Sequence, residues 1–91
     1  MSTQGTATVD FGNGATDVTV AVTGQASITT SNLVEAWIAI VSTANNTADN
    51  AWVEDLEIDA GNVVNATGFT IYAKCNRGRA FGQYKVNWVW N

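Results

Sequence analysis

The closing segment of the sequence, residues 67–91, constrains the fold more than any other part of the chain. Apolar side chains recur there at every second position, first over residues 69–75 and then, after a turn rich in Gly, Asn and Arg, over residues 84–90. Alternation of this kind is typical of β-strands with one face buried and one face exposed. We therefore predict a β-hairpin whose turn lies near residues 76–78.

The second strand of this hairpin carries the largest apolar side chains. The four that share its apolar face are Tyr84, Val86, Trp88 and Trp90. Burying a large apolar side chain contributes about 1.5–3 kcal/mol, so exposing this set to water would be unfavourable. We expect it to lie in the core of the domain or in a contact between subunits. The single cysteine, Cys75, is in phase with the apolar residues before it, and we expect it to be a buried apolar residue.

Five further segments show patterns typical of strands. They cover residues 6–11, 17–23, 26–30, 33–41 and 52–59, and a short apolar segment follows a turn at residues 60–62. Turns rich in Gly and Asn punctuate the chain. Together with the closing hairpin, these segments predict an all-β fold, a single-domain antiparallel β-sandwich or small jelly roll. The domain is expected to cover residues 6–91 and to follow a flexible tail at residues 1–5.

Residues 33–41, the most apolar run, admit two interpretations. In a helix, apolar residues from Val34 to Val41 would form one stripe. The run is short, rich in β-branched and aromatic residues, and surrounded by strand patterns, which favours a strand buried on both faces. Glu35 should then lie at a sheet edge or have a partner, because an unpaired buried carboxylate is costly.

The composition suits a protein that packs against other subunits. Charged residues make up 13% of the chain, against a usual value of about 25%. A surface with few charges also fits Thr-rich strands. The sequence contains no proline, so its edge strands lack one common protection against pairing with other chains. In a closed oligomer, neighbouring subunits would cover these edges.

The charges are separated along the sequence. Every basic residue lies in the closing segment, at Lys74, Arg77, Arg79 and Lys85. The acidic residues all come earlier, and Asp55, Glu57 and Asp59 share one face of the expected strand 52–59. Two arrangements explain this separation: the hairpin lies beside that strand in one sheet, or the hairpin of one subunit docks on the acidic strand of the next. The three carboxylates span too long a line to hold one metal ion, and we expect none.

Several functional classes are disfavoured. A net charge of −4 opposes binding to phosphates, so we expect no nucleic-acid partner. The chain has no histidine, no phosphate-binding loop and no dinucleotide fingerprint, so we expect no enzymatic activity and no cofactor. No apolar run approaches ~18 residues and no signal-peptide pattern is present, so we expect no membrane insertion.

The longest polar stretch, residues 42–51, is expected to be an exposed loop. The candidate binding residues of this loop and its end are Asn45, Asn46, Asp49 and Trp52. An exposed aromatic ring can stack on a sugar ring, so this loop is a candidate glycan-binding surface.

Several segments, in their order along the chain, are similar to one known group of proteins. They are DFG near the start, VTVAVTGQASI, SNLVEAWI, the polar loop, TGFTIYA and YKVNWVWN. This pattern covers nearly the whole chain and resembles small virion structural proteins of tailed bacteriophages. The motifs are patterns of strands and turns rather than catalytic signatures, so the resemblance assigns a role to no individual residue.

The resemblance implies a non-enzymatic protein of the virion surface, made in the cytoplasm of the bacterial host. Proteins of this group are commonly homotrimeric β-structures that decorate capsids or form parts of tail fibres. We expect a homotrimeric capsid decoration (cement) protein that binds the major capsid protein, or another virion protein, and stabilises the head. The alternative is a fibre-tip or lectin-like module that binds glycan on the host surface.

Overall fold

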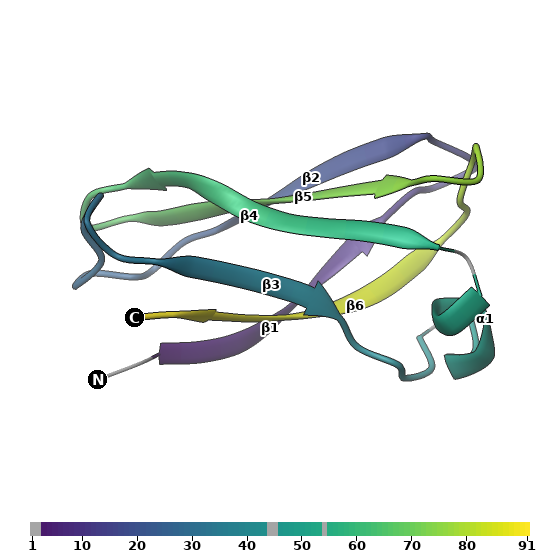
Figure 1. Ribbon diagram of the computed structural model, residues 1–91, viewed down its shortest axis with the longest axis horizontal. Helices are drawn as coiled ribbons and strands as arrows, with labels where there is room; N and C mark the ends of the chain where they lie inside the picture. Colours follow the sequence, from purple (N-terminus) through teal and green to yellow (C-terminus); the bar gives the residue numbers. More distant parts are fainter. Residues whose placement is uncertain (1–2, 44–45, 54) are drawn as a thin grey trace.

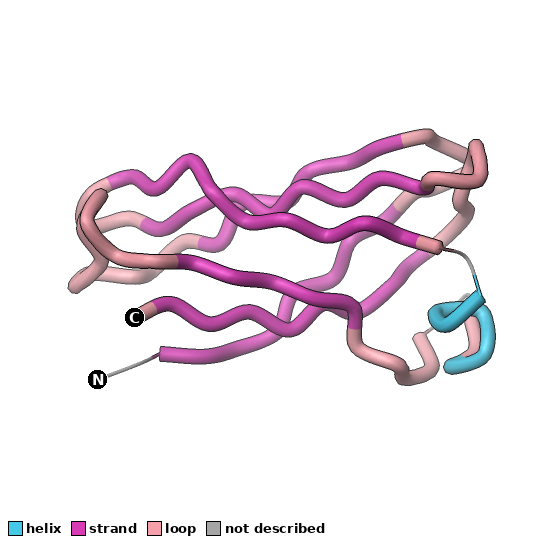
Figure 2. Tube along the Cα trace, in the orientation of Figure 1, coloured by secondary structure: helices cyan, strands magenta, loops and turns pink. Residues whose placement is uncertain are grey.

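The computed structural model describes residues 3–43, 46–53 and 55–91. Within these residues, six β-strands form two antiparallel three-stranded sheets, which pack face to face as a β-sandwich (Figure 1). The principal dimensions are 34 × 20 × 18 Å. The loops gather at the two ends of the long axis (Figure 2). The predicted all-β sandwich is thus confirmed.

The strands of the described residues are β1 (Thr3–Asp10), β2 (Asp17–Val22), β3 (Val34–Ile38), β4 (Leu56–Val64), β5 (Gly68–Cys75) and β6 (Gln83–Trp90). A short helix, α1 (Ala48–Val53), precedes β4. One sheet has the strand order β1-β6-β3 and the other has the order β2-β5-β4. The central strand of each sheet therefore comes from the closing segment.

The predicted closing hairpin is wrong, although both of its strands exist. β5 and β6 lie in different sheets, and residues 76–82 cross from one sheet to the other (Figure 1). In this crossover Ala80 exchanges two backbone hydrogen bonds with Ala15, at N···O distances of 3.0 and 3.1 Å. The link is longer than most hairpin loops, which have about 2–5 residues. The hairpin found in the structure joins β4 to β5 through residues 65–67.

The alternation in the closing segment is confirmed by burial. The inward side chains of β5 and β6 are all buried: Phe69, Ile71, Ala73, Cys75, Tyr84, Val86, Trp88 and Trp90. Because the two strands are central in opposite sheets, their apolar faces meet across the sandwich. The rings of Phe69 and Trp88 pack edge to face with centroids 5.4 Å apart, a favourable geometry for aromatic pairs.

β4 changes its phase within the strand. Leu56, Ile58 and Ala60 pack against the core, and a β-bulge between Gly61 and Val64 then brings Val63 inward. Asn62, inside the bulge, has a φ of 52°, which Asn tolerates better than most residues. The turn expected at residues 60–62 is therefore part of one continuous, bulged strand.

Three further expectations are corrected. Residues 26–30 form turns and not a strand, although Ile28 is buried. Residues 3–5, expected in the flexible tail, are the start of β1 and pair with residues 88–90 of β6. The strand expected at residues 52–59 begins only at Leu56, because residues 52 and 53 belong to α1.

Gly68→Ala should destabilise the domain by more than about 2 kcal/mol. A Cβ atom at this position would lie 1.7 Å from the carbonyl oxygen of Val22, so the backbone of β2 would have to move. Urea denaturation of both proteins measures the loss. Gly61→Ala is the matched control, because its Cβ would meet no atom within 4 Å, and it should change stability by less than about 1 kcal/mol. Equal stability of the two variants would contradict the packing of β2 on the start of β5.

Candidate functional site

The apolar set at residues 84–90 is part of the core of a single chain. Trp88 and Trp90 are 7% and 8% exposed without any second subunit. The indole N–H of Trp90 donates a hydrogen bond to Oε1 of Gln25 at 2.9 Å. Trp88 lies over Gly5, where a Cβ atom would come within 2.5 Å of its ring. Of the two expected places for this set, the structure favours the core, and no subunit contact is needed to bury it.

The expected charge pairs are only partly brought together. Lys74 of β5 and Glu57 of β4 form an ion pair within the chain, with Nζ and Oε2 3.3 Å apart. Both side chains are about half exposed, so the pair contributes at most about 1 kcal/mol. This is the same-sheet arrangement that the sequence suggested for β5. Asp59 lies on the same exposed face of β4, two positions beyond Glu57.

The other expected charges lie apart from this pair. Asp55 precedes β4 with a φ of 57°, and its carbonyl oxygen accepts a hydrogen bond from the Asn76 N–H at 3.2 Å. Arg77 and Arg79 lie in the crossover between the sheets, and Lys85 lies on the outer face of the other sheet. In the described residues, no group of three or more Cys, Asp or Glu side chains could hold a metal ion.

The polar stretch 42–51 contains the start of α1, which the sequence analysis missed. The backbone N–H of Asn50 donates to Oγ1 of Thr47 at 3.3 Å, so Thr47 caps the helix. Ala51 is 4% exposed and anchors the helix to the core. Thr47 followed by Asp49 in the first turn was the available signal, since both residue types favour helix starts.

The candidate binding residues of this stretch have different environments. Trp52 is 74% exposed on α1, which confirms the expectation of an exposed ring. Asp49 is exposed in the first helical turn. The side-chain amide of Asn46 instead donates to the carbonyl oxygens of Phe81 and Gln83, each at 2.9 Å, and so ties the loop to the fold. Asn45 lies outside the described residues.

A strip of exposed apolar side chains follows β3, and the sequence analysis missed it. The residues of this β3 strip and their exposed fractions are Leu33 (75%), Trp37 (47%), Ile40 (47%) and Val41 (42%). The run 33–41 was expected to be buried on both faces, but β3 alternates and buries only one face. Glu35 points outward in the same phase as Trp37, so the charge of Glu35 was the signal in the sequence that this phase is exposed. The expected position of Glu35 at a sheet edge is confirmed, because β3 is an edge strand.

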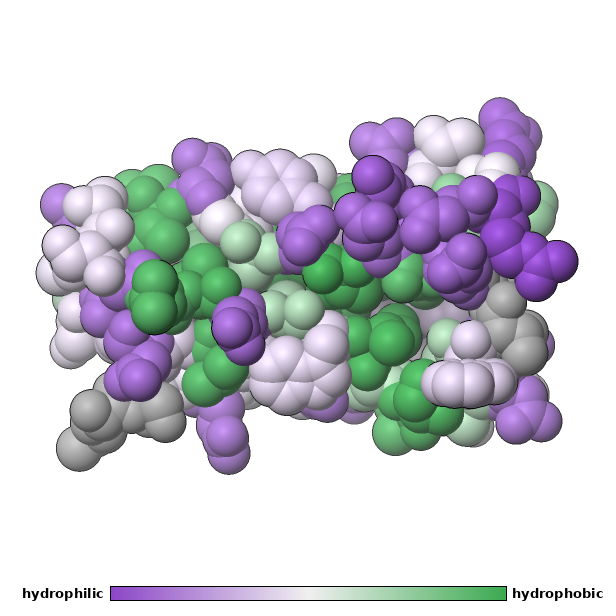
Figure 3. Space-filling model, in the orientation of Figure 1, coloured by the Kyte–Doolittle hydropathy of each residue, from purple (hydrophilic) through white to green (hydrophobic). Residues whose placement is uncertain are grey.

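The β3 strip borders a shallow groove between the two sheets. β3 and β4 are edge strands of different sheets and lie side by side (Figure 1). Residues 34–37 and 58–60 line the groove, which has a volume of about 260 Å³. Apolar side chains gather along this seam on the face seen in Figure 3. The seam therefore combines apolar side chains with two carboxylates, Glu35 and Asp59, beside an edge strand.

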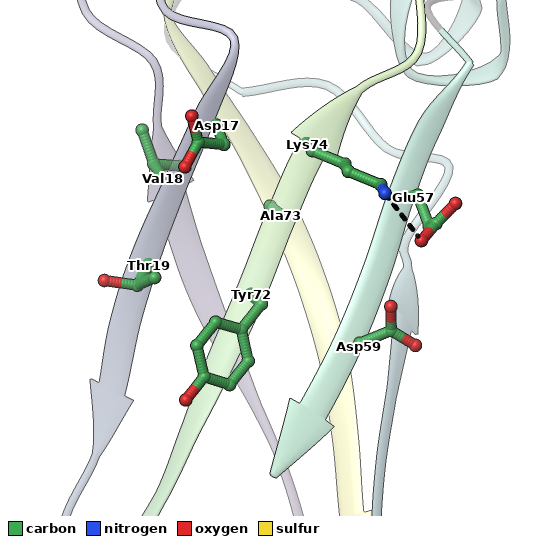
Figure 4. A pocket seen from close by; sticks show the side chains of 8 residues that line it. All are labelled: Asp17, Val18, Thr19, Glu57, Asp59, Tyr72, Ala73 and Lys74. Carbon is green, nitrogen blue, oxygen red and sulfur yellow. Dashed lines mark ion pairs between the residues drawn. The ribbon is translucent and has the colours of Figure 1, made fainter. Parts of the chain in front are cut away.

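A second hollow lies on the outer face of the β2-β5-β4 sheet (Figure 4). It has a volume of about 220 Å³ and is lined by Asp17, Val18, Thr19, Glu57, Asp59, Tyr72, Ala73 and Lys74. The aromatic ring of Tyr72, 42% exposed, lies on the central strand between the two edge strands. The surface thus combines one ring with charged and hydroxyl groups.

Comparison with known proteins assigns neither a family nor a function to the chain. No protein-family model matches the chain, and no curated protein matches it either. Among the described residues, no helix has the length and apolar character needed to cross a membrane.

Trp90→Ala should reduce the free energy of unfolding by about 3–5 kcal/mol, because it leaves a cavity in the core and removes the hydrogen bond that Gln25 Oε1 accepts from the indole N–H. A domain of this size has a total stability of only about 5–14 kcal/mol, so the variant would be marginally folded. Thermal and urea denaturation, followed by tryptophan fluorescence, measure the change. Trp52→Ala, the exposed control, should change stability by less than about 0.5 kcal/mol. Similar losses in both variants would contradict the different burial of the two rings.

Proposed function

We propose that this chain is a non-enzymatic surface protein of a bacteriophage virion, a homotrimeric decoration (cement) protein that stabilises the capsid. It would be made in the bacterial cytoplasm and would bind the major capsid protein on the assembled head. The resemblance of the sequence to small virion proteins supports the phage assignment. The observation that supports docking on the capsid is the β3 strip, which places exposed apolar side chains beside an edge strand. We take this strip as the contact surface.

The β3 strip suits docking for two physical reasons. Burying Leu33 and Trp37 against a partner would remove apolar surface from water, the main driving force of protein association. In the described part of the chain, β3 pairs only with β6, and its other edge borders β4 across a shallow groove that a segment of the partner could occupy. Capsid docking through this edge would cover both the apolar side chains and the groove.

Trimer formation needs other surfaces than the β3 strip. The burial of Trp88 and Trp90 within one chain removes the argument that these side chains require a subunit contact. What supports a trimer is the resemblance, together with the edge strands that pair on one side only in the described residues. A typical interface covers about 800 Å² of each partner, so the surface of 5313 Å² has room for subunit and capsid contacts.

Trp37→Lys should weaken binding to undecorated phage heads at least tenfold, because docking would bury an unpaired ammonium group. Co-sedimentation of the purified protein with heads measures the affinity. Tyr72→Lys is the matched control: Tyr72 is a similarly exposed aromatic residue, but it lies on the outer face of the opposite sheet. Retained binding by Trp37→Lys, or loss in both variants, would contradict docking through the β3 strip.

The purified protein should have a native mass of three times the 9.6 kDa of one chain. Light scattering on a sizing column measures this mass directly. Dilution should not dissociate a stable trimer at micromolar concentration. A monomer at all concentrations would refute the trimer and leave capsid docking to be judged by the binding experiment alone.

The second candidate function is glycan binding by a fibre-tip or lectin-like module. The observation that favours it is the exposure of Trp52, whose indole is available for stacking at one end of the sandwich. In this case Trp52 and the adjacent loop would contact the sugar, and Trp52→Ala would abolish binding.

A further inference from the structure

The hollow on the outer face of the β2-β5-β4 sheet has a regular arrangement. The strand register aligns its side chains in rows that cross the sheet (Figure 4). The first row is Asp17, Lys74 and Glu57; the second is Thr19, Tyr72 and Asp59; the third is Ala21, Thr70 and Gly61. The sheet therefore presents an aromatic ring with polar groups on three sides and a row of small residues on the fourth.

The middle row has polar groups available to a ligand. Neither Tyr72 nor Asp59 makes a side-chain hydrogen bond or ion pair with another residue that the structure describes. The Asp59 carboxylate can accept hydrogen bonds, and the hydroxyl groups of Thr19 and Tyr72 can both donate and accept. In the first row, Lys74 supplies a donor that Glu57 already holds in place. Donors and acceptors thus surround the face of one ring.

We propose that this hollow binds a neutral glycan, with one sugar ring stacked on Tyr72. The face of an aromatic ring is electron-rich and attracts the weakly positive C–H groups on the apolar side of a sugar ring. Asp59 would accept hydrogen bonds from sugar hydroxyl groups on one side of the ring, and Thr19 would contact hydroxyls on the other. These groups fix the orientation, as convergent polar groups do in small-molecule sites.

The charges of the hollow disfavour an acidic ligand. Asp17, Glu57 and Asp59 repel an acidic sugar, and the one ammonium group that lines the hollow, Lys74, is already paired with Glu57. A neutral sugar avoids this repulsion, and its hydroxyl groups can both donate to the carboxylates and accept from the hydroxyl groups of the hollow.

The size of the hollow limits the contact to one sugar residue. Its volume of about 220 Å³ is below the roughly 300–1,000 Å³ of pockets for drug-sized ligands. The third row consists of small residues, so an oligosaccharide could continue over the open sheet on that side. The site would therefore bind an internal sugar residue of an oligosaccharide rather than enclose its terminal residue. Asp59 also lines the groove beside the β3 strip, but neither Trp52 nor any residue of the strip lines the hollow, and the inference does not rest on the proposed capsid function.

The test uses the full chain, labelled with ¹⁵N, in NMR titrations with gluco-, manno- and galacto-oligosaccharides. Acidic galacturonate oligomers complete the panel. We expect at least one neutral oligosaccharide to shift amide signals of β2, β4 and β5, and acidic oligomers to bind at least about tenfold more weakly. Absence of binding by every neutral oligosaccharide at roughly 10 mM would overturn the proposal, as would a preference for the acidic oligomers.

Variants locate the site. Tyr72→Ala should weaken binding about tenfold or more, whereas Tyr72→Phe keeps the ring and should stay within about threefold. Asp59→Asn should weaken binding by removing an acceptor without disturbing the fold, which thermal melting checks. Trp37→Ala and Trp52→Ala are the controls with intact hollows and should bind as the unaltered chain does.

The outcomes separate this proposal from the other functions. Binding that survives Tyr72→Ala but is lost in Trp52→Ala would overturn the proposal and support the second candidate function. Head binding by Tyr72→Ala is measured in parallel, so a failure of the glycan site and a failure of capsid docking remain distinguishable.

Discussion

The packing of β5 against β6 across the sandwich is the contact on which the rest of the structure depends. Each of these strands is the centre of one sheet, and each presents a continuous apolar face to the other. Every other strand pairs with one of them, so the positions of β1 and β3 follow from β6, and those of β2 and β4 follow from β5. The edge-to-face contact of Phe69 with Trp88 lies within this central layer. Side chains from the edge strands then fill the remaining volume with smaller apolar groups.

In this architecture, the side chains on the two outer faces of the sandwich do not contribute to the core. The core uses only the inward phase of each strand, so the outward phase can carry residues that serve other purposes. On one sheet this phase includes Trp37, in a strip of exposed apolar side chains, and on the other it includes Tyr72, among polar and charged groups. The two surfaces differ in chemistry because the strip consists of apolar residues, whereas the hollow around Tyr72 is lined by carboxylates and hydroxyl groups. A protein of this size can therefore bind a protein partner and a polar ligand through opposite faces.

The sequence predicted which side chains of β5 and β6 are buried, but it did not predict their sheets. Alternation reports the phase of a strand, whereas the choice between a hairpin and a crossover depends on contacts such as that of Ala80 with Ala15, far away in the sequence. The same limitation explains the exposure of Trp37: apolar character suggested burial, but β3 lies at an edge with one face in solvent. The hollow around Tyr72 was not predicted either, because its rows join residues of three strands through the register.

The central position of β6 also determines when the domain can fold during synthesis. β6 is the last of the six described strands to be made, yet β1 and β3 pair only with it in that part of the chain. Until β6 is available, these two strands have no sheet to join, and the apolar side of β5 has no opposing layer. Strands β1 and β3 of the nascent chain therefore remain unpaired, with exposed apolar groups, until β6 has been synthesised. The rate of synthesis, about 5–20 residues per second, sets the length of this period. Assembly of the sandwich is a late and concerted event, in which the final strand completes one sheet and closes the core in the same step.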